Sequence, residues 1–280
     1  MRIAIDERRC TGCGRCVDVC GINFFARPGA KPRAADPVET CLRCGHCIAV
    51  CPKGAITHDG LAGVNLTDIS KKPGYEAFMA LLEARRSRRE FSDKPLSEEE
   101  IGKLLSAAVQ APNGLNQRNV RFTVITDLKA LKELSLRVGR ETAWLAGKLE
   151  SPLWRAFFRL WWGDQLDEIE PLIPLLGPMA EETLKGNDKV LYGAPCAILV
   201  QTRESESCGP EDAVYCGANI LLAAEALGLG ACVIGFLTEP VNRDKGMARL
   251  AGIPKGRKVH TSIVVGHPRF PYALGISRKP

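Results

Sequence analysis

The sequence lacks the short motifs that mark several common enzyme classes. Its 280 residues contain no Walker A motif, no HExxH and no GxSxG, so a zinc protease or a serine hydrolase has no support. Gly228 and Gly230 have no third glycine at the spacing of a GxGxxG, and a Rossmann interpretation is therefore weak. The composition, 45% apolar and 25% charged, excludes a mainly disordered or collagen-like chain.

Signals for export, membranes and nucleic acids are also scarce. The N-terminal MRIAIDERRC carries charges and has no apolar core of signal-peptide length, so we expect a cytoplasmic protein. One stretch, Ala218–Leu237, is almost wholly apolar. It could span a membrane, but its glycines and Glu225 favour a buried helix, a turn and a buried strand. The net charge of +6 suits small anions and is too diffuse to indicate a nucleic-acid partner.

Cysteine, by contrast, is abundant, with 12 residues of which eight lie within the first 51. These eight form two copies of the pattern C-x2-C-x2-C-x3-C, and the second copy follows the first by 31 residues throughout. The copies are Cys10, Cys13, Cys16 and Cys20, and Cys41, Cys44, Cys47 and Cys51. Such an internal repeat predicts two similar half-modules related by a pseudo-two-fold axis.

The spacing is typical of ligands to 4Fe–4S clusters, because three thiolates spaced by two residues let one tight loop hold three irons. The fourth cysteine of each run crosses to the other cluster. By this rule the ligand sets are Cys10, Cys13, Cys16 and Cys51, and Cys41, Cys44, Cys47 and Cys20. Zinc sites typically use pairs of CxxC hairpins, so zinc would leave the third and fourth cysteines of each run without a role. Disulfides do not suit a cytoplasmic chain. Residues 1–60 thus resemble bacterial-type two-cluster ferredoxins, and we expect His46 and His58 to be surface or structural residues.

A polar segment, Thr67–Gly74, ends in Pro-Gly and marks a domain boundary. We therefore expect a cluster domain over 1–66, a linker over 67–74 and a second domain over 75–280. In the second domain, Ser97 and Glu100 form a capping box for a helix that ends near Gln110. Strands are expected at 119–126, 194–202, 231–236 and 258–266, and a long buried helix at 213–227. Alternating strands and helices predict a layered α/β or α+β fold.

Two short motifs of this domain each allow two interpretations when they are considered alone. RRSRREF at 85–91 is a solvated helix end or an anion site, because guanidinium groups pair with phosphate. Asn116, after the helix break APNG, is a turn residue or a ligand-binding residue.

Four motifs in a fixed order carry a resemblance. RRSRREF at 85–91, APNGLNQ at 111–117, GAPCAILV at 193–200 and NILLAAEALGLGACVIG at 219–235 together resemble the nitroreductase family of FMN-dependent oxidoreductases. The resemblance runs from about Tyr75 onward. It implies an α+β protein in which a ferredoxin-like two-cluster domain precedes a nitroreductase-like three-layer α/β domain with a mixed sheet. It also implies FMN as a cofactor and a homodimer.

The resemblance assigns roles to individual residues. FMN-phosphate and ring-edge contacts would come from Arg85, Arg86, Ser87 and Arg89. Asn116 would contact the isoalloxazine, the backbone of Ile234 and Gly235 would lie against the flavin, and Arg278 and Lys279 would close the phosphate site. Gln117-Arg118-Asn119 departs from the family's usual xQPW, and no catalytic acid or base is assigned.

Residues 140–190 diverge from that family and hold all four tryptophans. We consider three roles for this aromatic segment. It packs in the core or against a dimer partner, it forms a lid over the flavin, or it forms a membrane-surface helix beside Arg155 and Arg159.

The expected function is that of an oxidoreductase. The clusters would relay single electrons to FMN from an external reduced ferredoxin or a similar low-potential donor. The flavin would then reduce a nitroaromatic, a quinone or an enone by hydride transfer. One alternative is a flavoprotein that NAD(P)H or an organic substrate reduces and that exports electrons through the clusters. Another is a non-enzymatic electron carrier or redox sensor.

Overall fold

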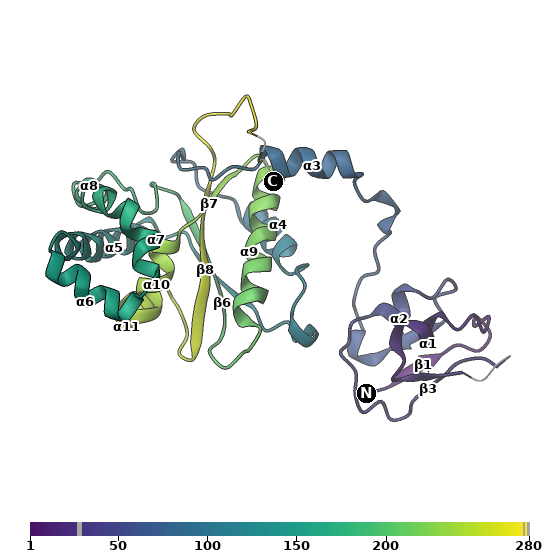
Figure 1. Ribbon diagram of the computed structural model, residues 1–280. Helices are drawn as coiled ribbons and strands as arrows, with labels where there is room; N and C mark the ends of the chain where they lie inside the picture. Colours follow the sequence, from purple (N-terminus) through teal and green to yellow (C-terminus); the bar gives the residue numbers. More distant parts are fainter. Residues whose placement is uncertain (27–29, 277, 279–280) are drawn as a thin grey trace. The chain divides into compact units, whose positions relative to one another are not determined.

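The computed structural model describes residues 1–26, 30–276 and 278 (Figure 1). Its contacts divide the chain into two compact units. The first comprises Met1–Pro73 and Leu115–Gln117, and the second comprises Gly74–Gly114 and Arg118–Pro280. The boundary after Pro73 falls inside the segment expected to be a linker.

Short elements surround the cysteines of the first unit. In chain order they are β1 Ile3–Ile5, α1 Arg15–Cys20, β2 Phe24–Phe25, β3 Arg33–Ala34, α2 His46–Ala49, β4 Ile56–His58, η1 Asp59–Leu61 and η2 Ile69–Lys71. β1 pairs with β4 and β2 pairs with β3, both antiparallel. The buried core consists of Ile3, Phe24, Val38, Ile56, Cys16 and Cys47. A core this small is typical of domains whose stability depends on bound metal.

The repeat in the sequence is visible in the backbone of this unit. Gly14 and Gly45 precede α1 and α2, and both have a φ of 76°. Gly12 and its equivalent in the second copy, Arg43, also have positive φ values of 72° and 51°. This left-handed region suits glycine and strains other residues. Its recurrence at equivalent positions supports the predicted pair of half-modules.

The second unit is built around one four-stranded sheet. Its elements and the short η3 are α3 Tyr75–Ala84, α4 Glu98–Ala108, η3 Gly114–Asn116, β5 Arg121–Ile125, α5 Leu128–Leu149, α6 Pro152–Trp162, α7 Gln165–Ile169, η4 Glu170–Leu172, α8 Ile173–Leu184, β6 Cys196–Arg203, α9 Gly209–Ala226, β7 Gly230–Val233, α10 Gly235–Arg243, α11 Lys245–Leu250 and β8 Arg257–Gly266. The strand order is β5-β6-β8-β7, and every pair is antiparallel. A parallel bridge from Ser87 to Ala231 extends the sheet beyond β7. Among the described residues, this bridge supplies the parallel part of the expected mixed sheet, and the four strands themselves are antiparallel.

The alternation of side chains along β6 explains the three layers. Ile198 and Val200 pack with α4 and α9 on one face of the sheet. Ala197 and Leu199 point to the other face and pack with α5, α10 and α11. Successive strand residues face opposite sides, so a strand covered on both faces reads as a continuous apolar run. The three-layer α/β fold predicted for this unit is confirmed, with helices on both sides of the sheet (Figure 1).

Several predicted element boundaries agree with the structure and two do not. The helix expected at 213–227 begins earlier, at Gly209. The capping box of Ser97 and Glu100 is present at the start of α4. The strand expected at 231–236 ends at Val233 instead, because Gly235 begins α10. The apolar stretch Ala218–Leu237 comprises the end of α9, a turn, β7 and the start of α10. In the described part of the chain, no helix is long and apolar enough to cross a membrane.

Candidate functional site

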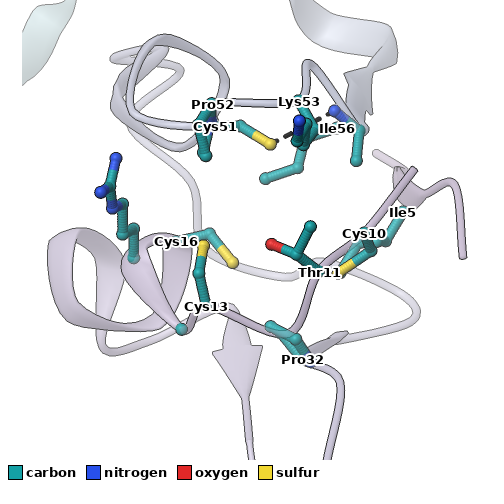
Figure 2. A pocket seen from close by; sticks show the side chains of 13 residues that line it. Ile5, Cys10, Thr11, Cys13, Cys16, Pro32, Cys51, Pro52, Lys53 and Ile56 are labelled. Carbon is teal, nitrogen blue, oxygen red and sulfur yellow. Dashed lines mark hydrogen bonds between the residues drawn. The ribbon is translucent and has the colours of Figure 1, made fainter.

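A cavity in the first unit gathers one of the two predicted cysteine sets. Its lining includes Cys10, Cys13 and Cys16 from the first run and Cys51 from the second (Figure 2). The fourth cysteine therefore reaches across to the other run, as the spacing rule predicts. The backbone N–H of Ala55 donates a hydrogen bond to the Cys51 sulfur at 3.2 Å.

The other four cysteines of the two runs form the second group, which consists of Cys20, Cys41, Cys44 and Cys47. Burial raises the pKa of the Cys47 thiol to about 11, and the nearby thiols of Cys20, Cys44 and Cys41 add to the shift. In the first group, burial likewise raises the pKa of Cys16, which is equivalent to Cys47 in the repeat. Thiols become thiolates when they ligate a metal, so a bound metal would reverse both shifts.

The spread of the cysteines suits a cluster better than a single ion. Among residues 1–26, 30–276 and 278, no group of three or more Cys, His, Asp or Glu side chains converges closely enough to hold one metal ion. Zinc requires four sulfurs or nitrogens at about 2.3 Å or less from one centre. Sulfurs placed around a cavity instead fit the larger cubane core of a 4Fe–4S cluster.

The arginine-rich motif of the second unit lies in the loop between α3 and α4. Ser87 bridges to Ala231, and the backbone N–H of Arg88 donates to the Ala231 carbonyl at 3.0 Å. Gly230 permits this close approach, because an ideal Cβ there would lie 2.8 Å from the Arg88 Cβ. The motif is thereby held along the edge strand β7.

The arginines of this loop differ in their burial and in the residues that they contact. Arg88, which the sequence analysis did not select, is buried and lies 3.5 Å from the centre of the Tyr272 ring. Arg86 donates to the Ile276 carbonyl at 3.3 Å, so the C-terminal segment runs beside the motif. Arg85 is half-buried and Arg89 is exposed. Arg278 is exposed as well, and Lys279 lies outside the described residues.

A cavity of about 850 Å³ brings three of the predicted flavin residues together. Arg89, Ile234 and Gly235 all line it. So does Tyr192, which sequence reasoning missed and whose φ of 59° is rare for a residue with a bulky side chain. Burial raises the pKa of the Tyr192 phenol, although the Arg89 cation opposes this shift. Strained residues of this kind concentrate at functional sites.

The divergent segment 140–190 forms another wall of the same cavity. Trp144, Leu145, Phe158 and Leu176 contribute from α5, α6 and α8. Behind this wall lies a buried cluster, which shares Leu176 with it and consists of Ala146, Leu149, Leu166, Ile173 and Leu176. The segment therefore packs as a small core and also encloses the cavity, so both roles remain compatible with the structure.

Asn116 is the last residue of η3 and belongs to the first unit. Its backbone is left-handed, with a φ of 54°. Its side-chain amide donates to the carbonyls of Leu42 and Arg43 at 2.7 and 2.9 Å. Contact between Asn116 and a flavin remains a prediction.

Comparison with known proteins decides the family. Residues 82–267, well over half of the chain, match the model described as the nitroreductase family. The chain belongs to the nitroreductase family. Residues 9–56 match the model described as a 4Fe-4S dicluster domain, so both resemblances found in the sequence are confirmed.

Individual relatives agree with this family assignment. An Archaeoglobus fulgidus protein named NADH dehydrogenase/NAD(P)H nitroreductase is 27% identical over 194 residues, which cover 69% of this chain and 87% of the relative. A Bacillus subtilis FMN reductase [NAD(P)H] is 25% identical over 183 residues, covering 65% of this chain and 62% of the relative.

Solved structures agree with the fold. An FMN-dependent nitroreductase from Clostridium difficile R20291 has a TM-score of 0.50 at 25% identity, covering 72% of this chain and 95% of its own. A nitroreductase with bound FMN from Bacteroides fragilis has a TM-score of 0.54 at 20% identity, covering 72% and 94%. The α+β class and the nitroreductase-like fold are thus confirmed for the second unit.

Proposed function

We propose that this protein is an FMN-dependent oxidoreductase in which two 4Fe–4S clusters supply electrons to the flavin. The observation that carries the proposal is the presence, in one chain, of two four-cysteine groups and a nitroreductase domain with a large cavity. When bound, the clusters would carry electrons singly, and FMN would deliver them in pairs as hydride to a nitroaromatic, quinone or enone.

The cysteines divide into two ligand sets in this proposal. One cluster is held by Cys10, Cys13, Cys16 and Cys51, and the other by Cys20, Cys41, Cys44 and Cys47. The shared cavity of the first set and the mutual proximity of the thiols in the second support this division. Backbone N–H donors to the sulfurs of Cys51 and Cys41 add support, because such donors accompany cluster binding.

The residues of the second unit fit a flavin phosphate and ring. A phosphate dianion requires several cationic donors. We assign the contacts with the phosphate and the ring edge to Arg85, Arg86, Ser87 and Arg89, and the closing of the phosphate site to Arg278 and Lys279. Ile234 and Gly235 would lie against the ring in the cavity that Arg89 also lines. Asn116 is assigned to the isoalloxazine edge on the family resemblance.

The cavity walls favour a flat apolar acceptor. Val138, Leu145 and Phe158 supply aliphatic and aromatic surface, and Glu141 with Arg243 forms an ion pair of 2.6 Å that places charge beside that surface. Ligand sites are commonly apolar pockets with a few fixed polar groups. We therefore assign the segment 140–190 the role of shaping the acceptor site.

A second candidate is suggested by the names of the relatives. Both the A. fulgidus and the B. subtilis proteins are named for NAD(P)H. In this alternative, NAD(P)H reduces the flavin and the clusters export the electrons to a protein acceptor. The cofactors and their assigned residues are the same, and only the direction of electron flow differs.

A homodimer completes the proposal. α3 has no buried residue, and its Tyr75, Phe78 and Leu82 are exposed. On α9, Val214 and Tyr215 are exposed as well. Unpartnered apolar side chains of this kind mark interaction surfaces. A gel-filtration profile of a monomer that retains FMN would contradict the dimer.

The proposal is tested by removing the cluster ligands from the full-length protein. In the double variant Cys16→Ala and Cys47→Ala, we expect loss of iron with retention of FMN. Reduction of menadione by reduced ferredoxin should then fall to the uncatalysed rate. Unchanged ferredoxin-driven turnover in a variant without iron would refute a role for the clusters. The variant Cys208→Ala is the matched control, because Cys208 is an exposed free cysteine outside both groups.

A further inference from the structure

Two buried polar side chains of the first unit point to sulfurs of the same cysteine group. His58 and Asn23 are 6% and 5% exposed. The Nε2 of His58 lies 3.4 Å from the Cys41 sulfur, and the Nδ2 of Asn23 donates to the Cys20 sulfur at 3.8 Å. Both Cys41 and Cys20 belong to the second ligand set. Burying a polar side chain costs free energy unless it finds a hydrogen-bond partner. The sulfurs of Cys41 and Cys20 are those partners for His58 and Asn23.

The environment of His58 determines which nitrogen carries the proton. Its Nδ1 is buried and has no hydrogen-bond partner among the described residues, and the nearest Asp59 oxygen is 3.9 Å away. A metal-bound thiolate only accepts hydrogen bonds. With a cluster bound to Cys41, the Nε2 of His58 would therefore carry the proton and donate a hydrogen bond to the Cys41 sulfur.

Packing holds the ring of His58 in this position. His58 ends β4 and pairs with Ile3 of β1, which fixes the backbone of the strand. On the next turn, an ideal Cβ at Gly60 would lie 3.1 Å from the ring carbon Cε1. Gly60 thus leaves room for the ring, which is only 6% exposed and lies beside the Cys41 sulfur.

Among the described residues, the first ligand set has no buried side-chain donor: the Thr11 hydroxyl donates to the Cys13 sulfur, but Thr11 is exposed. His58 and Asn23 are the only buried polar residues in the described part of the first unit, and both serve the second set. The Cys51 sulfur accepts from the backbone N–H of Ala55, and the Cys41 sulfur likewise accepts from the backbone of Arg43 at 3.3 Å. Further backbone N–H groups serve both sets, from Arg15 and Val17 to the Cys13 and Cys16 sulfurs and from Ile48 to the Cys47 sulfur. Among the described residues, buried side-chain donors serve the second set alone.

We propose that His58, assisted by Asn23, raises the reduction potential of the cluster held by Cys20, Cys41, Cys44 and Cys47 above that of the other cluster. Reduction adds one negative charge, which the cluster shares with its sulfurs. An N–H donor stabilises this added charge more than it stabilises the oxidised form, so the potential rises. Each electron that enters the first unit from an external reduced donor then rests mainly beside His58. His58 acts as a tuning residue and not as a ligand.

This inference rests on the proposed function only in requiring that both clusters are present. The test is a redox titration of the anaerobically purified full-length protein, followed by electron paramagnetic resonance. In the variant His58→Leu, we expect one of the two one-electron steps to move to lower potential while the other stays in place. Asn23→Leu should move the same step by a smaller amount. His58→Gln keeps an N–H donor and should recover part of the original potential.

His46→Leu is the matched control. His46 lies between Cys44 and Cys47 but is exposed, so both steps should keep their potentials. Unchanged potentials in an iron-replete His58→Leu protein would overturn the inference. An equal shift of both steps, or the same shift in His46→Leu, would also overturn it. If His58→Leu loses iron, the variants Asn23→Leu and His58→Gln provide the test instead. Reduction potentials equal to those of the unsubstituted protein in both variants would refute the tuning role.

The iron and sulfide content of the unsubstituted protein reports separately on the proposed function. Iron for only one cluster would contradict the two-cluster assignment. A shifted step in a fully loaded variant would support the role of His58 whatever the acceptor or the direction of electron flow.

Discussion

Replacement of Gly230 by alanine tests how the arginine motif is held on the sheet. A Cβ at this position would lie 2.8 Å from the Cβ of Arg88, 3.0 Å from its Cγ and 3.3 Å from the Phe91 ring. The Arg88 Cβ is attached to the backbone, so the loop itself must move. Phe91 is a buried core residue and resists the movement. Overpacking of this kind costs about 1–3 kcal/mol.

That cost should appear in the affinity for FMN, because Ser87 and Arg89 flank the displaced residue. At about 1.4 kcal/mol for each factor of ten, the dissociation constant of FMN should rise by about 5- to 140-fold if the whole cost falls on FMN binding. The assay is a fluorescence titration of the full-length protein with FMN, with iron content measured in parallel. We expect iron to stay constant, since the eight cysteines of the two ligand sets lie in the other unit.

The control for this prediction is Gly102→Ala. Gly102 lies within α4, and no heavy atom comes within 4 Å of its ideal Cβ. Alanine is favoured over glycine in helices by about 0.5–1 kcal/mol, so this variant should unfold at a slightly higher temperature and bind FMN normally. If Gly230→Ala also bound FMN normally and unfolded at the original temperature, the close packing of the motif on β7 would be refuted.

Three further predictions concern other parts of the chain. Arg85→Ala should weaken FMN retention without changing iron content, and loss of both cofactors together would indicate misfolding instead of a lost phosphate contact. Burial raises the pKa of Cys196 to about 12 and that of Cys216 to about 11, so at pH 8 roughly one thiol in a thousand or fewer is a reactive thiolate. Brief iodoacetamide treatment should therefore label exposed Cys208 first, and equal labelling by mass spectrometry would contradict this burial. Ser97→Ala should lower the free energy of unfolding by about 1 kcal/mol near neutral pH. The Ser97 N–H and hydroxyl lower the pKa of Glu100 below its usual 4.5, so this difference should persist above that value and shrink in more acidic urea titrations; an unchanged difference would refute the capping interaction.

Features with local causes were predictable from the sequence. The cysteine spacing needs only one tight loop per run, and left-handed glycines such as Gly14 and Gly45 occur where that loop turns. The capping box at Ser97 depends on residues three positions apart. The apolar run of β6 follows from burial on both faces of the sheet. Each of these patterns is complete within a few residues.

Features that depend on distant segments were not predictable. Arg88 is buried because Tyr272, far away in the sequence, lies over its guanidinium. The cavity beside Arg89 is assembled from α5, α6, α8, β7 and α10, which meet only in the folded chain. Tyr192 adopts a left-handed backbone that its side chain does not favour, and its place before Gly193 was the only sequence signal. Likewise, the sequence places His58 near the clusters but does not reveal its contact with Cys41.

The most direct test of the central proposal is an anaerobic absorbance titration of the reconstituted full-length protein. NADH, NADPH and reduced ferredoxin are added in turn, and the flavin and cluster bands are followed separately. We predict that ferredoxin bleaches both bands and that neither nicotinamide bleaches the flavin. Rapid bleaching of the flavin by NADH or NADPH before any change in the cluster bands would contradict electron entry through the clusters and would favour export to a protein acceptor.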